Sequence, residues 1–73
     1  MTNANDFGRQ LHTYWLIVDY VRSKGFPPTI EELAAQRGLS TNSVYEHLRQ
    51  LEQRGYITRT RGWRNIRLPG RAA

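Results

Sequence analysis

The chain has 73 residues, 38% of them hydrophobic, no cysteine and a formal net charge of +5 at pH 7. A chain of this length hides only about 60% of its unfolded surface, which allows one small domain but no deep substrate pocket beside a core. The lack of cysteine excludes disulfide scaffolds and thiolate metal sites, and two well-separated histidines do not form a metal site, so we expect no metal and no cofactor.

The N-terminal part of the sequence predicts a flexible arm followed by a helix. Residues 1–9 are polar and show no helical period. From residue 11 to residue 23, apolar side chains recur at the spacing of a buried helical stripe, at Tyr14, Ile17, Val18 and Val21. Trp15 falls on the polar side of this helix. Gly25 and the prolines at positions 27 and 28 end the helix and enforce an extended connection.

A capping box at Thr29–Glu32 predicts the start of a second helix. In such a box the threonine hydroxyl accepts from the glutamate amide, and the carboxylate accepts from the threonine amide. Gly38 ends this helix, because glycine readily adopts the left-handed conformation that closes a helix. Ser40 or Thr41 then supplies the hydroxyl that caps the next helix.

The third helix is predicted from Thr41 to Arg54, with Gly55 as its end. Its buried side consists of Val44, Leu48 and Leu51. His47 lies near that side, where a packing role is expected. The opposite face is polar and carries little net charge: Asn42, Glu46, Arg49, Gln50 and Gln53, with Ser43 and Tyr45 on its edges. This uncommitted face is the first candidate for a contact surface.

The C-terminal part predicts a β-hairpin that carries the whole excess of positive charge. Residues 56–60 and 65–68 are strand-like, and Gly62 lies at the turn between them. Residues 1–53 contain five basic and six acidic residues, whereas residues 54–73 contain six arginines and no acidic residue. Arginine matches phosphate oxygens and base edges by geometry as well as by charge, which indicates a polyanionic partner. The alternative is a solvated basic tail that only aids solubility.

Three helices followed by an arginine-rich hairpin predict a mainly α, α+β fold, a winged helix-turn-helix over residues 10–69. Ala34 lies four residues before Gly38, where the second and third helices approach closely, and Val44 lies six residues after it and anchors the third helix. Residues 70–73 are expected to form a frayed tail. The alternative is a plain three-helix bundle with a hairpin tail.

The motifs between residues 10 and 68 resemble the N-terminal DNA-binding domain of LexA-type repressors. The resemblance lies in the loop GFPPT, in EELAAQRGL, in VYEHLRQLEQRGYI and in the arginine-bearing hairpin that ends on IRL. It implies a winged helix-turn-helix that binds double-stranded DNA and regulates transcription as a repressor. The segment between Gly38 and Val44 is about one residue shorter than is usual in that family. The chain ends where the self-cleaving domain of the family would begin, so induction by autoproteolysis is not inferred.

The resemblance and the helical rotation point to the same reading surface. The base-reading segment of the family falls on residues 40–46, and the rotation independently selects Asn42, Glu46 and Arg49. Asparagine pairs with adenine, glutamate accepts from the cytosine amino group, and arginine reaches a guanine or a phosphate. The base-reading candidates are Ser40, Thr41, Asn42, Ser43, Tyr45, Glu46 and Arg49. The candidates for contact with the DNA backbone or minor groove are Thr29, Arg59, Arg61, Trp63, Arg64 and Arg67.

The sequence predicts a sequence-specific DNA-binding transcriptional regulator, with the third helix in the major groove. One module of this size contacts too few base pairs for genomic selectivity, so we expect a homodimer on paired half-sites. The alternative is a winged-helix protein-interaction or assembly module that binds an acidic partner, supported by Trp15 and Trp63. A third option is structured RNA, whose narrow major groove leaves the third helix without a reading role.

Other classes of function are not expected. No nucleophile, base and orienting residue converge in the sequence, so neither an enzyme nor a small-molecule substrate is predicted. No apolar run has the length of a membrane span, and the N-terminus does not have the pattern of a signal peptide. We therefore expect a cytoplasmic, nucleoid-associated location.

Overall fold

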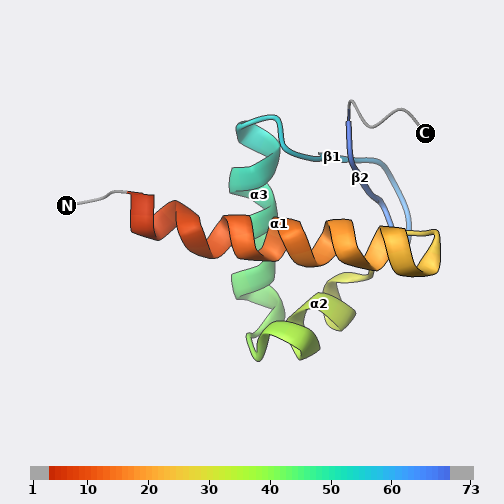
Figure 1. Ribbon diagram of the computed structural model, residues 1–73, viewed down its shortest axis with the longest axis horizontal. Coiled ribbons are helices and arrows are strands. Elements are labelled where there is room, and N and C mark those ends of the chain that lie inside the picture. The colour runs from red at the N-terminus through yellow and green to blue at the C-terminus, as the bar shows by residue number, and fades with distance from the viewer. Residues whose placement is uncertain (1–3, 70–73) are drawn as a thin grey trace.

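The computed structural model describes residues 4–69, and the side chains of residues 7–69. The order of elements is α1 (Ala4–Lys24), α2 (Ile30–Arg37), α3 (Thr41–Gln53), β1 (Thr58–Arg59) and β2 (Ile66–Arg67). α1 runs along the molecule and α3 crosses it, with α2 before one end of α3 and the hairpin after the other (Figure 1). The predicted winged helix-turn-helix architecture is confirmed. Within residues 4–69, no helix is long and apolar enough to cross a membrane.

α1 begins earlier than predicted. The prediction of a flexible arm over residues 1–9 is wrong for residues 4–9, which are helical; residues 1–3 lie outside the described part of the chain. Phe7 provides the physical reason, because its ring lies 5.6 Å from the Tyr56 ring and 4.0 Å from the guanidinium carbon of Arg54. These contacts fasten the first turns of α1 to the segment that follows α3.

The starts of α2 and α3 follow the predicted caps. The amide of Glu32 donates to the Thr29 hydroxyl at 3.1 Å, and the amide of Thr29 donates to Glu32 Oε1 at 2.9 Å, so both halves of the capping box form. Gly38 closes α2 in the left-handed conformation, with φ of 69°. Ser40 is the cap of α3, because its hydroxyl accepts from the amide of Ser43 at 3.2 Å. Such caps satisfy amides that have no partner inside the helix.

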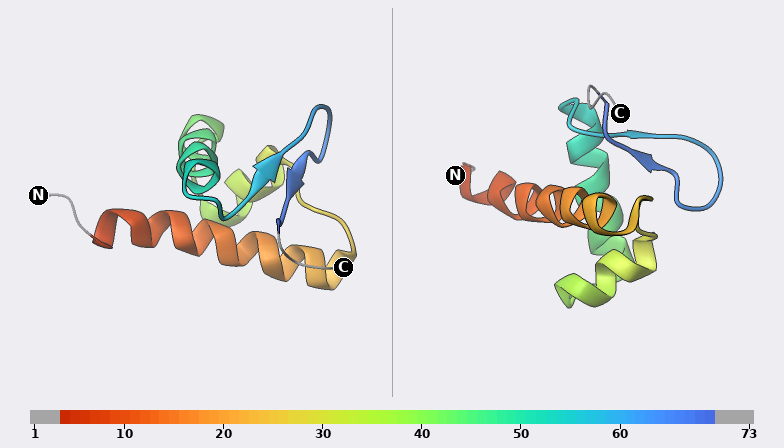
Figure 2. Two further views of the ribbon diagram at one scale, coloured as in Figure 1. Left: turned by 90° about the horizontal axis from the view of Figure 1, so that it is seen from above. Right: turned by 45° about the vertical axis from the view of Figure 1, so that its right-hand side comes forward.

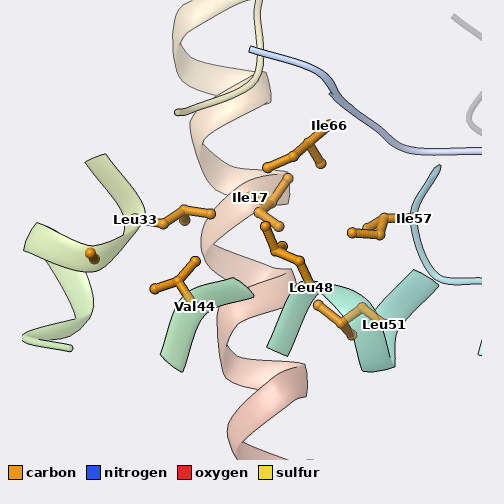
Figure 3. Close-up of a cluster of buried hydrophobic side chains, with 8 residues drawn as sticks. Ile17, Leu33, Val44, Leu48, Leu51, Ile57 and Ile66 are labelled. Atoms are coloured by element: carbon orange, nitrogen blue, oxygen red, sulfur yellow. The ribbon is translucent and has the colours of Figure 1, made fainter. Parts of the chain in front are cut away.

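One hydrophobic core joins the three helices and the hairpin. Its members are Ile17, Leu33, Ala34, Val44, Leu48, Leu51, Ile57 and Ile66 (Figure 3). None of them is more than 7% exposed, and burying an aliphatic side chain of this size stabilises the fold by about 1.5–3 kcal/mol. Ile57 and Ile66 belong to the hairpin segment. The wing is therefore packed into the domain, contrary to the alternative of a bundle with a hairpin tail.

The strands of the hairpin are shorter than predicted. The ladder consists of Thr58 paired with Arg67 and Arg59 paired with Ile66, and the residues predicted to extend it lie outside the ladder. Two such pairs are marginal by themselves in water, so the buried isoleucines hold the hairpin in place. Gly62 lies in the connecting loop with φ of 93°, as expected for the predicted turn. The predicted tail, residues 70–73, lies outside the described residues.

Candidate nucleic-acid interface

One face of α3 carries exposed polar side chains. The residues that pack inward are Val44, His47, Leu48 and Leu51, and the exposed residues include Thr41, Asn42, Tyr45, Glu46 and Arg49. The exposure of these side chains shows that this face of α3 is accessible among the described residues. Among residues 7–69, the side chains of Asn42, Glu46 and Arg49 make no hydrogen bond or ion pair with one another or with the rest of the domain. Their polar groups are available to a partner.

The first turn of α3 is partly engaged by its own cap. Besides accepting from the Ser43 amide, the Ser40 hydroxyl donates to the Ser43 hydroxyl at 3.2 Å. Thr41 and Asn42 are the exposed polar side chains that follow the cap. The predicted base-reading set therefore has two parts: Ser40 and Ser43 hold the helix start, whereas Asn42 and its neighbours on the face remain open.

The inner side of α3 is anchored on α1 by a buried polar network. Thr13 is fully buried, and its hydroxyl lies 3.0 Å from His47 Nδ1 and accepts from Arg37 Nε at 3.1 Å. The Thr13 hydroxyl thus links the ring of His47 to the guanidinium of Arg37. Burial lowers the pKa of His47, and the charges of Arg37 and Arg9 lower it further. The predicted packing role of His47 is confirmed, and the network orients α3 about its own axis.

A shallow hollow of about 550 Å³ flanks α3 on the side of the first turns of α1. Arg9, His12, Arg37 and Ser43 are among its lining residues. Arg37 Nη1 lies 3.1 Å from His12 Nδ1, and because arginine only donates, the imidazole accepts. Arg9, a surface cation, and His12 beside it were not among the site residues predicted from the sequence. Phe7 lies two helical turns before Tyr14 on the same stripe, a signal that could have placed Arg9 on the helix.

The tip of the wing projects Arg61 and Trp63 into solvent. Trp63 is 76% exposed, and the side chain of Arg61 is exposed and makes no hydrogen bond or ion pair among the described residues. Arg59 lies closer to α3: its guanidinium carbon is 5.4 Å from the centroid of the Tyr45 ring. Arg59 was predicted to contact the DNA backbone and Tyr45 to contact the bases, so this contact joins the two predicted sets. The wing and the open face of α3 therefore form one continuous surface.

Three of the residues predicted to contact the DNA backbone are engaged by the protein. Arg64 forms a two-pronged ion pair with Glu32, with both N–O distances at 2.9 Å. Arg67 Nη1 donates to the carbonyls of Arg64 and Ile66 at 3.0 and 3.1 Å. Thr29 is buried in its capping box. The hydrogen bonds from Arg64, followed by the one from the Thr29 amide, lower the pKa of Glu32 from 4.5 to about 2.

The comparison with known proteins decides the family. The sequence model of a protein family, the LexA DNA binding domain, matches residues 7–64 of this chain. The chain belongs to the LexA DNA binding domain family. This LexA-family match begins at Phe7, inside α1, and reaches Arg64 at the tip of the wing. It thus spans most of α1, all of α2 and α3, and the first strand of the hairpin.

Individual relatives agree with the family match. The LexA repressor of Cupriavidus metallidurans is 50% identical over 62 residues, which cover 82% of this chain and 28% of that protein. The LexA repressor of Lactobacillus acidophilus is 41% identical over 58 residues, covering 78% of this chain and 28% of the relative. The LexA repressor of Leptospira biflexa is 51% identical over 41 residues, covering 56% and 20%. The LexA-family chain thus spans only 20–28% of the length of these curated relatives.

Proposed function

We propose that this LexA-family domain binds double-stranded DNA in a sequence-specific manner and acts as a transcriptional repressor. The observation that carries the proposal is the open polar face of α3, flanked by the wing on one side and by the Arg9 and His12 hollow on the other. A face of this kind, with cations on both sides, suits a helix that lies in the major groove between two phosphate backbones.

The side chains on the face match the groups that base pairs present in the major groove. Asn42 can accept and donate together, as an adenine edge requires, and Glu46 can accept from the amino group of cytosine. Arg49, two turns further along α3, reaches a guanine or a phosphate. Thr41 and Tyr45 complete the open part of the reading surface, and the capping hydroxyls of Ser40 and Ser43 lie at its start.

The flanks of the face supply the affinity that does not depend on sequence. Arg61 offers a free guanidinium to a phosphate or to the minor groove, and Trp63 can lie on a sugar edge. Arg59 and Arg67 add positive charge beside them. On the other flank, Arg9 is exposed at the start of α1. Phosphate contacts on both sides of α3 would fix the register of the helix on the duplex.

A single domain of this size contacts few base pairs, so repression of a chosen promoter requires two copies on paired half-sites. We therefore include a homodimer on DNA in the proposal. The relatives that match the chain are called LexA repressors, which supports the direction of regulation. Action on chromosomal DNA entails a cytoplasmic, nucleoid-associated location, and the proposed role requires neither a cofactor nor catalysis by these residues.

Selection of bound duplexes from a random pool tests this function. The proposal expects a short consensus, arranged as two half-sites related by a two-fold axis, and an affinity that falls steeply with salt. With about six phosphates neutralised, binding should weaken on the order of a thousandfold between 50 and 200 mM salt. Recovery of unrelated sequences would refute specific recognition, and a flat salt response would refute the role assigned to the arginines.

A protein-interaction module remains the second candidate, and one observation favours it. Trp15 is 56% exposed on α1 and its ring contacts only the neighbouring Tyr14 ring among the described aromatics. The Trp15→Ser variant separates the two functions. If DNA binding is the function of the surface described above, this variant selects the same duplexes as the parent. Loss of a co-purifying acidic protein with intact DNA binding would instead assign a second role to α1.

A further inference from the structure

Arg64 lies at the centre of a cluster of contacts at the tip of the wing. Its Nη1 donates to Glu32 Oε1 and to the carbonyl oxygen of Pro27, both at 2.9 Å, and lies 3.4 Å from the Tyr20 hydroxyl oxygen. The guanidinium also lies 4.7 Å from the centroid of the Phe26 ring. Only about a fifth of the Arg64 side chain is accessible, at 20%. The side chain therefore faces the interior of the domain.

The carboxylate of Glu32 accepts hydrogen bonds from three parts of the chain. Glu32 Oε1 accepts from the Thr29 amide at 2.9 Å, from the Tyr20 hydroxyl at 3.0 Å and from Arg64 at 2.9 Å. Tyr20 comes from α1, Thr29 and Glu32 from the start of α2, and Arg64 from the wing. Figure 2 shows the hairpin beside the connection between α1 and α2, as these bonds require. The capping box of α2 is thus also the attachment point of the wing.

The backbone conformation of Arg64 is a second indication that this cluster holds the wing in place. Arg64 has φ of 51°, and it is the one residue other than glycine with positive φ among the described residues. A residue with a side chain is strained in that conformation, because its Cβ atom lies too close to the following carbonyl oxygen. The contacts of the guanidinium offset this strain. Trp63, whose ring centroid lies 4.5 Å from the same guanidinium, is thereby held in a defined direction.

We propose that Arg64 is a positioning residue of the wing, which locks the hairpin tip onto Glu32 and so sets where Arg61 and Trp63 meet the DNA. The inference rests on the proposed function. This role takes the place of the direct contact between Arg64 and a phosphate that the sequence predicted. For a phosphate to be bound by the same two nitrogens, the guanidinium would have to leave Glu32, and the carboxylate would then stand unpaired beside the negatively charged DNA. Arg61 is exposed and needs no such exchange.

A double-mutant cycle on DNA affinity tests the inference. Glu32→Gln keeps an acceptor for the capping box but removes the ion pair, and Arg64→Ala removes the same pair from the other side. Each variant should weaken binding to the selected duplex about three- to tenfold, as expected for lost hydrogen bonds between charged groups. The double variant should bind no more weakly than Arg64→Ala alone. Arg64→Lys should lose nearly as much as Arg64→Ala, because an ammonium cannot reproduce the fork.

A phosphate contact by Arg64 predicts the opposite results. Glu32→Gln would then free the cation and strengthen binding, the two losses would add, and Arg64→Lys would retain most of the affinity. Any one of these outcomes overturns the inference. Glu31→Gln is the matched control, since it removes a neighbouring acidic charge that is exposed and makes no ion pair among the described residues. Its effect on affinity measures the general electrostatic gain and is subtracted from that of Glu32→Gln.

Order in the free protein gives an independent readout. Heteronuclear ¹⁵N relaxation should show the amides of residues 60–65 becoming mobile in Glu32→Gln and in Arg64→Ala, with the rest of the domain unchanged. An equally rigid wing in both variants overturns the inference even if affinity falls. If the unmodified chain binds no duplex, the proposed function fails, and the relaxation measurement still decides whether Arg64 holds the wing.

Discussion

The open face of α3 and the wing differ in how their polar side chains are used. On α3, Asn42, Glu46 and Arg49 have no partner within the described residues, although the helix beneath them is firmly packed. In the wing, the arginines are numerous but mostly engaged: Arg59 lies on Tyr45, Arg64 on Glu32, and Arg67 on backbone carbonyls. Net charge alone would have assigned the wing the larger part of the interface.

The difference separates two kinds of contribution to recognition. Free hydrogen-bonding groups on a rigid helix can discriminate between bases, since a wrong base leaves them unpaired. Arginines that are bound to the protein fix the shape of the wing and leave few guanidiniums for phosphates. Sequence preference should therefore depend on α3, and salt-dependent affinity on Arg61 and a small number of cations around it.

The largest effect is expected where the two regions share the core. Ile66→Ala, at a wing residue that is 1% exposed, should lower the free energy of unfolding by about 2–5 kcal/mol, as Leu48→Ala should in α3. Denaturant unfolding followed by circular dichroism and by tryptophan fluorescence measures both. The two probes should report one transition. Separate transitions, or no change in Ile66→Ala, would show that the wing is an appendage and not part of the domain.

The next effect concerns the reading surface. Asn42→Ala should weaken binding to the selected duplex by about 1–3 kcal/mol and leave binding to unrelated duplexes unchanged, because a bidentate base contact is lost. Fluorescence anisotropy with both duplexes measures the ratio. Gln36→Ala, at an exposed residue of α2 away from this face, is the control and should change neither value. An equal loss on both duplexes would mean that Asn42 contacts the backbone.

A smaller effect is expected from the free arginine of the wing. Arg61→Ala should weaken specific and unrelated duplexes alike and should reduce the slope of log K against log salt by about 0.9, the value for one phosphate contact. Arg22→Ala removes the same charge from the exposed side of α1 and serves as the control. A slope that stays the same in Arg61→Ala would remove Arg61 from the phosphate contacts.

The smallest effect concerns acid stability. Because the pKa of Glu32 is lowered from 4.5 to about 2, the unfolded chain takes up this proton more readily than the folded one. The stabilisation from the pair is thus complete above pH 4.5 and is lost as the pH falls toward 2. Solvent screening limits its size, since 38% of the Glu32 side chain is accessible.

Unfolding curves of Glu32→Gln measured from neutral to acid pH check this prediction. The variant should be less stable than the parent at pH 7, and the two curves should converge as the pH falls. Parallel curves would contradict the assignment of the low pKa to the pair. Glu31→Gln, which changes the adjacent exposed carboxylate, should leave the shape of the curve close to that of the parent.

Features set by residues close in sequence could be predicted. The capping box joins Thr29 to a residue three positions on, and the polar face of α3 follows from its helical period, so both are confirmed. The start of α1 was missed because its only local signal is the spacing between Phe7 and Tyr14, while the partners that hold Phe7, Arg54 and Tyr56, lie far along the chain. Only the folded domain brings that ring into contact with them.

The inward turn of Arg64 could not be predicted for a related reason. Glu32 lies 32 residues earlier, and nothing in the sequence shows which arginine of the hairpin it meets. The pairing of Arg64 with Glu32 depends on a positive φ at Arg64, and a residue with a side chain rarely adopts such a φ. The bond between Thr13 and His47 spans 34 residues and was unseen for the same reason. Local chemistry predicted the helices and the exposed polar face of α3, whereas tertiary contacts decide which cations remain free.

Selection from a random duplex pool, repeated with Asn42→Ala and with Arg61→Ala, tests the separation of these two roles most directly. The account predicts that Arg61→Ala recovers the consensus of the unmodified domain at lower affinity. It predicts that Asn42→Ala recovers a consensus relaxed at one position of each half-site, with the other positions kept. A consensus that changes in Arg61→Ala and stays intact in Asn42→Ala would contradict the account, because the wing would then read the sequence.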